Sequence, residues 1–151
     1  MQDGVYVINN FFAYGTLMFE DIMTAVCGGG YASESALLKN YRCFAVRGEV
    51  YPGIRPQKAA VVAGKVYISL TQAAWKRLDR FEGQMYRRDA IEVELASGRV
   101  AAAQTYVVRP EFAYRLSSKA WSAEKFLRAG KMQFQKHYRG FEALKHTEGD
   151  R

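Results

Sequence analysis

The sequence is poor in the residues that build disulfide frameworks and metal centres. Its two cysteines, Cys27 and Cys43, are too far apart for a CxxC motif and too few for a disulfide framework. Its two histidines, His137 and His146, lie far in sequence from every other candidate ligand. Signatures of serine hydrolases, metalloproteases and nucleotide-binding loops are also missing. We therefore expect no metal site and no catalytic Cys–His pair, and a reduced, cytoplasmic setting.

Long apolar runs and dense blocks of one charge are likewise absent. No run approaches the roughly 18 to 20 residues of a membrane span, and the N-terminus lacks the basic start and apolar stretch of a signal peptide. The net charge is +7, but the nine Lys/Arg of residues 111–151 are interleaved with five Asp/Glu. This pattern is typical of a solvated helix. We expect neither a membrane nor a specific nucleic acid as partner.

Aromatic residues, in contrast, are abundant, with ten tyrosines and nine phenylalanines. A chain of 151 residues without a long linker is expected to form one domain over 1–151. Its core is predicted at about 11–110, followed by a C-terminal helix over about 122–141, which Gly130 interrupts. We expect the aromatic face of this helix to lie on a sheet.

Several short strand patterns precede that helix. They lie at 5–7, 11–14, 35–38, 41–46, 61–68, 90–95 and 100–108. The last two are expected to form a hairpin, because Ala96-Ser97-Gly98 provides a turn between them. A helix is predicted at 19–26, ended by the glycines at 28–30, and a turn at 51–56. Many short strands with few helices favour a curled antiparallel or mixed sheet that forms a small barrel.

One carboxylate occupies an unexpected position. The segment from Thr71 to Gly83 predicts a short helix with threonine as N-cap and glycine as stop. Its apolar face carries Trp75 and Phe81, and Glu82 falls within roughly 20° of Trp75 on the helical wheel. Glu82 also lies at the helix C-terminus, where the macrodipole disfavours negative charge. Burial and the dipole both raise the pKa of Glu82, which suits a general acid/base near neutral pH.

A purely structural interpretation of these acidic residues stands beside the catalytic one. Glu82 can reach the edge of the helix, or pair with Arg87 or Arg88 just beyond the turn. Asp79, at the edge of the apolar sector, is expected to be a cap or salt-bridge partner rather than a second catalyst.

The segment 12–18, Phe-Ala-Tyr-Gly-Thr-Leu-Met, is predicted to run from a strand through a tight turn into a helix. Gly15 permits a close approach between the backbone and a ligand. The amides that follow, and the helix N-terminus behind them, can bind an anion. Tyr14 and Thr16 add hydroxyl groups at the same place. Strand–turn–helix segments with glycine are nevertheless common, so a structural role alone also accounts for the pattern.

Three segments together resemble the gamma-glutamylcyclotransferase-like family, which includes gamma-glutamylamine cyclotransferases and the plant avirulence-induced proteins. They are the segment 12–18, the Tyr-Pro-Gly-Ile at 51–54, and the Leu-Asp-Arg-Phe-Glu-Gly at 78–83, followed by Tyr86 and Arg88. The resemblance covers about 11–108. It implies an α+β fold, a small mixed β-barrel with flanking helices and a cavity at one end.

The resemblance also implies an activity. Family members convert a gamma-glutamyl amine or amide to 5-oxoproline and a free amine without a cofactor, and the family's acid/base glutamate corresponds to Glu82. The loop that holds the gamma-glutamyl group corresponds to Tyr14, Gly15, Thr16 and Leu17. Tyr51, Tyr86 and Arg88 are expected to line the cavity or support the glutamate. The alternative is a binding module on the same fold that turns nothing over. The leaving amine and the oligomeric state stay open.

Overall fold

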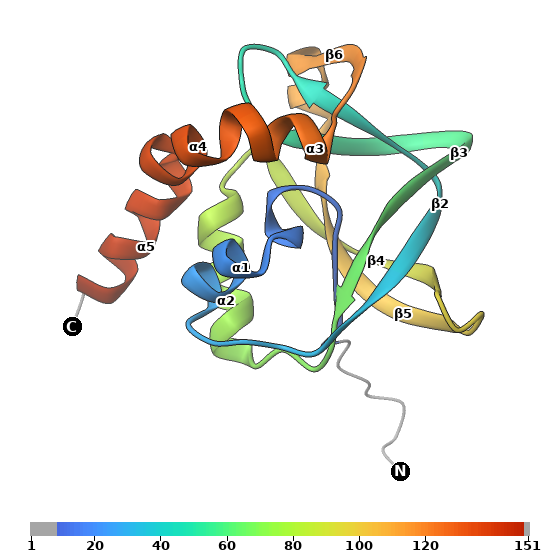
Figure 1. The fold of residues 1–151 in the computed structure, drawn as a ribbon, viewed down its shortest axis with the longest axis horizontal. Helices are drawn as coiled ribbons and strands as arrows, with labels where there is room; N and C mark the ends of the chain where they lie inside the picture. Colours follow the sequence, from blue (N-terminus) through green and yellow to red (C-terminus); the bar gives the residue numbers. More distant parts are fainter. Residues whose placement is uncertain (1–8, 150–151) are drawn as a thin grey trace.

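A computed structural model describes residues 9–149 of the chain, with side chains described as far as Lys145. Five strands form a closed barrel in the spatial order β3-β1-β5-β4-β2 and back to β3 (Figure 1). They are β1 (Phe11–Ala13), β2 (Ser33–Val46), β3 (Pro52–Tyr67), β4 (Tyr86–Leu95) and β5 (Val100–Val108). The barrel is mixed, because β1 runs parallel to β5 and every other pairing is antiparallel. The predicted α+β barrel is confirmed; the strand predicted at 5–7 lies outside the described residues.

Alternation along the strands divides the apolar side chains between two cores. Phe12, Leu38 and Val107 belong to a cluster built from all five strands, which fills the barrel. Their neighbours Phe11 and Tyr106 point the other way and pack against the helices. Short β1 thus contributes to both cores. It carries the chain directly from the barrel wall to the residues that follow Ala13.

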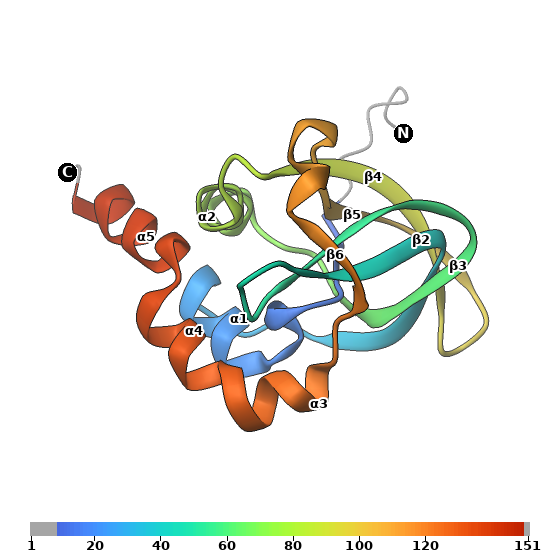
Figure 2. The ribbon, with the colours of Figure 1, turned by 90° about the horizontal axis from the view of Figure 1, so that it is seen from above.

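The helices lie together on one side of the barrel (Figure 2). Helix α1 (Glu20–Cys27) ends at Gly28, whose φ of 81° is left-handed. Helix α2 (Gln72–Glu82) is capped by Thr71 and ended by Gly83, as the sequence predicts. The C-terminal segment comprises α3 (Ala123–Lys125), a π-turn η3 (Phe126–Gly130), α4 (Lys131–His137) and α5 (Arg139–Gly149).

The predicted interruption at Gly130 is confirmed as a π-turn that ends at this residue, where φ is −120° before α4 begins, and the segment has a further break at Tyr138, whose ψ of 129° is extended. Another prediction about the C-terminal segment is wrong. Its aromatic face packs on α2 rather than on the sheet, because Phe134 and Phe141 both contact the ring of Phe81 at centroid distances of 6.1 and 5.0 Å. The C-terminal segment therefore extends the helical layer.

Strands β2, β3 and β6 also differ from the prediction. The expected turn at 51–56 is the start of β3, which pairs with β2 from Pro52 onward. Proline is tolerated there because Pro52 begins the strand and Pro56 faces an irregularity of β2 at Asn40, where φ is 67°. The two strands predicted at 35–38 and 41–46 form the single strand β2. Strand β6 (Leu116–Ala120), which pairs with the end of β2, was not predicted. The hairpin of β4 and β5 is confirmed.

Candidate active site

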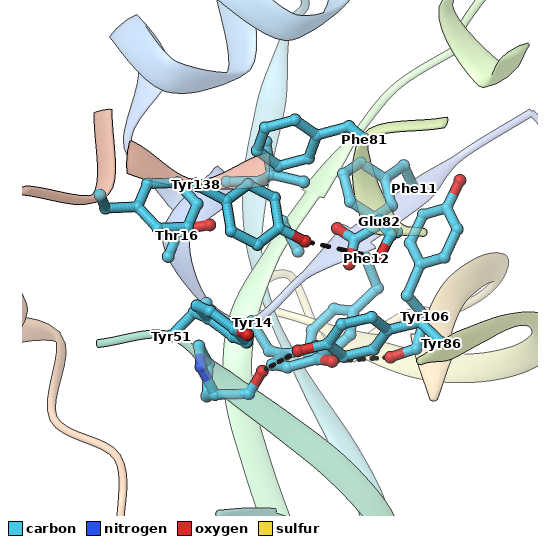
Figure 3. A pocket seen from close by; sticks show the side chains of 15 residues that line it. Phe11, Phe12, Tyr14, Thr16, Tyr51, Phe81, Glu82, Tyr86, Tyr106 and Tyr138 are labelled. Carbon is cyan, nitrogen blue, oxygen red and sulfur yellow. Dashed lines mark hydrogen bonds between the residues drawn. The ribbon is translucent and has the colours of Figure 1, made fainter. Parts of the chain in front are cut away.

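A pocket opens where the helical layer meets the end of the barrel, and it encloses about 390 Å³ of atom-free space including its mouth (Figure 3). Seven residues proposed from the sequence line it: Tyr14, Gly15, Thr16, Leu17, Tyr51, Glu82 and Tyr86. Segments that lie far apart in the sequence therefore meet at one place.

The architecture of α2 sets the position of Glu82. The Thr71 hydroxyl accepts a hydrogen bond from the Ala74 amide at 3.1 Å and fixes the start of the helix. Leu78 and Phe81 are fully buried, so the last turn is held against the core. Figure 3 shows the Glu82 carboxyl group among the aromatic side chains of the pocket.

The environment of Glu82 is apolar and carries negative charge nearby. Its side chain is partly buried, and burial together with the carboxylate of Asp79 raises its pKa to about 8. The pocket lining contains no lysine, arginine or histidine. A carboxyl group with this pKa exchanges protons readily near neutral pH, which is the property required of a general acid/base.

Four tyrosine hydroxyls around the pocket donate to acceptors of the protein. Tyr14 donates to the Tyr106 carbonyl and Tyr86 to the Pro52 carbonyl, both at 2.7 Å. Tyr106 donates to Asp79 Oδ1 at 2.7 Å, and Tyr138 donates to the Glu82 carbonyl at 3.4 Å. Burial raises the pKa of all four tyrosines. They therefore remain neutral, and their rings form a rigid, uncharged wall.

The 14–17 loop follows β1 and forms the floor of the pocket. A β-carbon on Gly15 would lie 2.6 Å from Pro52 Cγ. Contact with Pro52 of the same chain, rather than with a ligand, therefore explains the glycine at this position. Thr16 begins a single 3-10 turn, η1 (Thr16–Met18). Within the described residues, the amides of Gly15, Thr16 and Leu17 form no hydrogen bond. No described acceptor therefore occupies these three adjacent amides, which belong to residues that line the pocket.

The helix predicted at 19–26 is confirmed as α1 (Glu20–Cys27), and Met18 and Phe19 separate it from the 14–17 loop. Its first turn carries the carboxylates of Glu20 and Asp21. Any positive potential at the loop therefore comes from the amides themselves rather than from the α1 macrodipole.

Arg88 lies outside the pocket lining. Its guanidinium group pairs with Asp79 Oδ2 at 3.3 Å and stacks over Trp75 at 4.6 Å from the ring centroid. This pair confirms Asp79 as a salt-bridge partner. Arg87 pairs with Asp89 at 2.9 Å, so both arginines that were considered as partners of Glu82 bind other carboxylates.

Sequence reasoning missed several residues of the pocket wall. Tyr106 comes from the second half of β5, and Phe134 and Tyr138 come from the C-terminal segment. The helical spacing of Phe134 and Tyr138 marks an apolar face, but spacing does not reveal what that face covers.

Two kinds of site are not found among residues 9–149. No group of three or more His, Cys, Asp or Glu side chains there is arranged to hold a metal ion. None of the described helices is long and apolar enough to cross a membrane.

The fold and the pocket define the class of this protein: a closed mixed barrel with a pocket at its helical end. Solved structures share the fold. A protein of Arabidopsis thaliana determined in solution has a TM-score of 0.68 at 24% identity, with 95% of both chains covered. A gamma-glutamyl cyclotransferase has a TM-score of 0.63 at 18% identity, covering 90% of this chain and 85% of the other. At these identities the likeness concerns the fold alone.

Sequence similarity defines the family. The model of the family described as "Gamma-glutamyl cyclotransferase, AIG2-like" matches residues 11–123. AIG2-like protein D of Arabidopsis thaliana is 33% identical over 108 residues, which are 70% of this chain and 71% of the relative. AIG2-like protein C of the same plant is 33% identical over 97 residues, or 64% of this chain and 56% of the relative. The chain belongs to the gamma-glutamyl cyclotransferase, AIG2-like family.

Proposed function

We propose that the protein is a cyclotransferase that converts a gamma-glutamyl amine or amide to 5-oxoproline and a free amine, with Glu82 as general acid/base. The observation that carries the proposal is the partly buried Glu82 carboxyl group, whose pKa is raised to about 8, in a pocket that also contains the free amides of the 14–17 loop. Family membership supports the same reaction class.

The reaction requires the substrate to fold back on itself. The alpha-amine nitrogen attacks the gamma-carbonyl carbon, a carbon–nitrogen bond closes the five-membered ring, and the bond to the leaving nitrogen breaks. Glu82 takes the proton that the alpha-ammonium group loses and returns it to the leaving nitrogen. Holding the amine and carbonyl in contact contributes several kcal/mol, because the enzyme has already restricted their relative motion. The protein then needs no nucleophile of its own.

The amides of the 14–17 loop serve as the anchor for the substrate's alpha-carboxylate. The described pocket lining has no cationic side chain, so its donors for an anion are backbone amides and the hydroxyl groups of Thr16 and Tyr51. Successive amides in a turn suit a carboxylate, and hydrogen bonds to a charged acceptor are stronger than neutral ones. The tyrosine and phenylalanine rings enclose the apolar methylene groups of the glutamyl chain.

Release of 5-oxoproline tests the proposal. Wild-type protein and Glu82→Gln are incubated with a panel of gamma-glutamyl amines and dipeptides, and 5-oxoproline is quantified. We expect release by the wild type and at least a roughly 100-fold lower rate for the variant, in line with loss of a general acid/base. Glu92→Gln, which changes an exposed carboxylate of β4, is the matched control and retains the wild-type rate.

The panel also separates catalysis from binding alone. If Glu82→Gln stays folded and releases 5-oxoproline as fast as the wild type, Glu82 is not the acid/base. If no substrate yields 5-oxoproline while 5-oxoproline itself binds, the protein is a binding module on the same fold.

A further inference from the structure

Tyr138 separates α4 from α5, and its side chain reaches the end of α2. Its backbone is extended, with a ψ of 129°, and the next residue begins α5. Its ring lies 4.9 Å from the ring of Phe81, measured between centroids, and its hydroxyl donates to the Glu82 carbonyl at 3.4 Å. The break in the C-terminal segment thus contacts the two residues with which α2 ends.

Gly140, the second residue of α5, brings this segment into direct contact with the backbone of α2. A β-carbon at Gly140 would collide with the Phe81 carbonyl oxygen and with the Tyr138 ring. The last carbonyls of a helix have no partner within it, and the Tyr138 hydroxyl donates to one of them, on Glu82. The backbone that carries the Glu82 side chain is therefore held by close packing and by a hydrogen bond.

The Tyr138 ring also borders the Glu82 side chain from two spaces. One is the pocket described above. The other is a hollow on its outer side, with about 1330 Å³ of atom-free space including its mouth, which we call the outer hollow. Glu82 and Tyr138 line both spaces, and Figure 3 shows the Tyr138 hydroxyl directed at Glu82. Tyr51 packs edge-on against Tyr138 at 5.1 Å between ring centroids and supports the ring at this boundary.

The charged groups around Glu82 lie mainly on the side that the Tyr138 ring covers. The outer hollow is bordered by Arg80, by Arg115 at the end of the 3-10 segment η2 (Pro110–Arg115), and by Arg139 and Glu142 of α5. The pocket itself contributes neutral hydroxyls, from Tyr14, Tyr51, Tyr86 and Tyr106. Asp79 lies one turn back on α2. Loss of the ring would therefore expose Glu82 to water and to the nearby arginines.

We propose that Tyr138 is a positioning residue for Glu82, whose hydroxyl holds the last turn of α2 and whose ring keeps water away from the Glu82 carboxyl group. An aromatic ring suits this task, because it covers a large area with little conformational freedom. The importance of this shielding for catalysis rests on the proposed function, in which Glu82 is the acid/base. The shielding itself is a property of the folded protein and can be measured without a substrate.

The pKa of Glu82 tests the inference directly. Carbon-13 NMR of protein labelled at the glutamate carboxyl carbons follows the titration, and Glu82→Gln assigns the resonance by its absence. We expect Tyr138→Ala to lower the Glu82 pKa from about 8 by roughly one unit or more, because water and positive charge both favour the ionised form. Tyr138→Phe keeps the ring and is expected to keep a pKa close to that of the wild type.

Phe141→Ala is the matched control. Phe141 is half-buried like Tyr138 and lies 5.0 Å from the Phe81 ring, but it lines neither the pocket nor the outer hollow. Its removal is expected to destabilise the same helical layer while leaving the Glu82 pKa unchanged. If Tyr138→Ala does not fold, Tyr138→Leu takes its place, with a smaller decrease in the pKa expected because an apolar group remains.

The outcomes separate this inference from the proposed function. A wild-type Glu82 pKa in the folded Tyr138→Ala or Tyr138→Leu protein would overturn the inference. An equal decrease in Phe141→Ala would also overturn it, since general loosening of the layer would then explain the change. If the wild type releases 5-oxoproline, the rising limb of its kcat/KM against pH is expected to move to lower pH in Tyr138→Ala and to stay in place in Tyr138→Phe. No release by the wild type would refute the proposed function, whereas a lowered pKa in Tyr138→Ala alone would still support the positioning role.

Discussion

The carboxyl groups of Asp79 and Glu82 share the last turn of α2. The pKa of Glu82 is raised to about 8, mainly by burial and to a smaller extent by the charge of Asp79. Asp79 itself is held by Arg88 at 3.3 Å and by the Tyr106 hydroxyl at 2.7 Å. The two acids therefore have different roles. Asp79 is an anchored charge, and Glu82 is the group whose protonation state changes near neutral pH.

The raised pKa of Glu82 predicts a pH-dependent cost in stability. The folded-state pKa is about 8, against 4.5 for an unperturbed glutamate. The folded protein thus binds the proton more tightly than the unfolded chain, and stability falls as the pH rises from about 4.5 through 8. Glu82→Gln removes this cost. We expect the variant to exceed the wild type by roughly 2–4 kcal/mol at pH 9, with a much smaller difference at pH 5.

Urea denaturation at both pH values measures this difference. Glu92→Gln on β4 is again the control, because its carboxylate is exposed and its removal leaves the pH dependence unchanged. If Glu82→Gln changes the free energy of unfolding equally at pH 5 and pH 9, the pKa of Glu82 is not raised in the folded protein.

The Asp79–Glu82 relationship predicts a shift in the pH profile. If ionised Glu82 is the base, kcat/KM rises with pH through about 8. Asp79→Asn removes the neighbouring charge and lowers the Glu82 pKa, so the profile moves toward acidic pH. We expect this decrease in the Glu82 pKa to be smaller than the increase that burial causes, because the substitution leaves Glu82 buried. The asparagine side chain can still accept the hydrogen bond from the Tyr106 hydroxyl.

The control for this prediction is Asp89→Asn, which removes the carboxylate that pairs with Arg87. A pH profile that moves equally in both variants would contradict the role assigned to Asp79.

The close packing of Gly15 against Pro52 predicts a steric penalty. In Gly15→Ala the new methyl group meets Pro52 Cγ at 2.6 Å and Cδ at 2.9 Å, so the loop or the start of β3 must shift. We expect a loss of about 1–3 kcal/mol in the free energy of unfolding, as for other overpacked sites. Gly29→Ala is the control, because no atom lies within 4 Å of the position that its methyl group would occupy. Equal stability of the two variants in urea would refute the constraint.

The Tyr86 hydroxyl predicts an effect of similar size. Tyr86→Phe removes the 2.7 Å hydrogen bond to the Pro52 carbonyl and leaves a buried acceptor without that donor. The expected cost is about 1–3 kcal/mol in unfolding free energy. Tyr114→Phe, at a position that is 69% exposed, is expected to cost close to nothing. Thermal melts of both variants measure the difference, and a neutral Tyr86→Phe would mean that the bond contributes no net stability.

Local chemistry explains why parts of the fold could be predicted from the sequence. Thr71 and Gly83 delimit α2 because the threonine side chain accepts from a backbone amide of the first turn and the glycine, with a positive φ of 77°, donates to the Asp79 carbonyl. The position of Glu82 at the pocket follows from the same helix, since its neighbours Leu78 and Phe81 must be buried. These signals lie within a few residues of one another, so no tertiary information is needed.

The errors share a different cause, because each concerns a contact between distant segments. Tyr51 and the residues after it resemble a turn, but pairing with β2 holds them in a strand. Tyr106 reaches the pocket only because β5 lies beside β1 in the closed barrel. The C-terminal aromatic residues pack on Phe81 of α2 rather than on the sheet. Helical spacing identifies an apolar face without identifying its partner.

The C-terminal helices complete a pocket whose other residues lie within the family match. That match ends at residue 123, whereas Phe134 and Tyr138, which line the pocket, come after it. The shared segment supplies the carboxyl group and the amide loop, and the C-terminal helices supply part of the enclosure. Exchanging those helices between relatives is thus expected to change which molecules fit the pocket while Glu82 and the 14–17 loop stay in the chain.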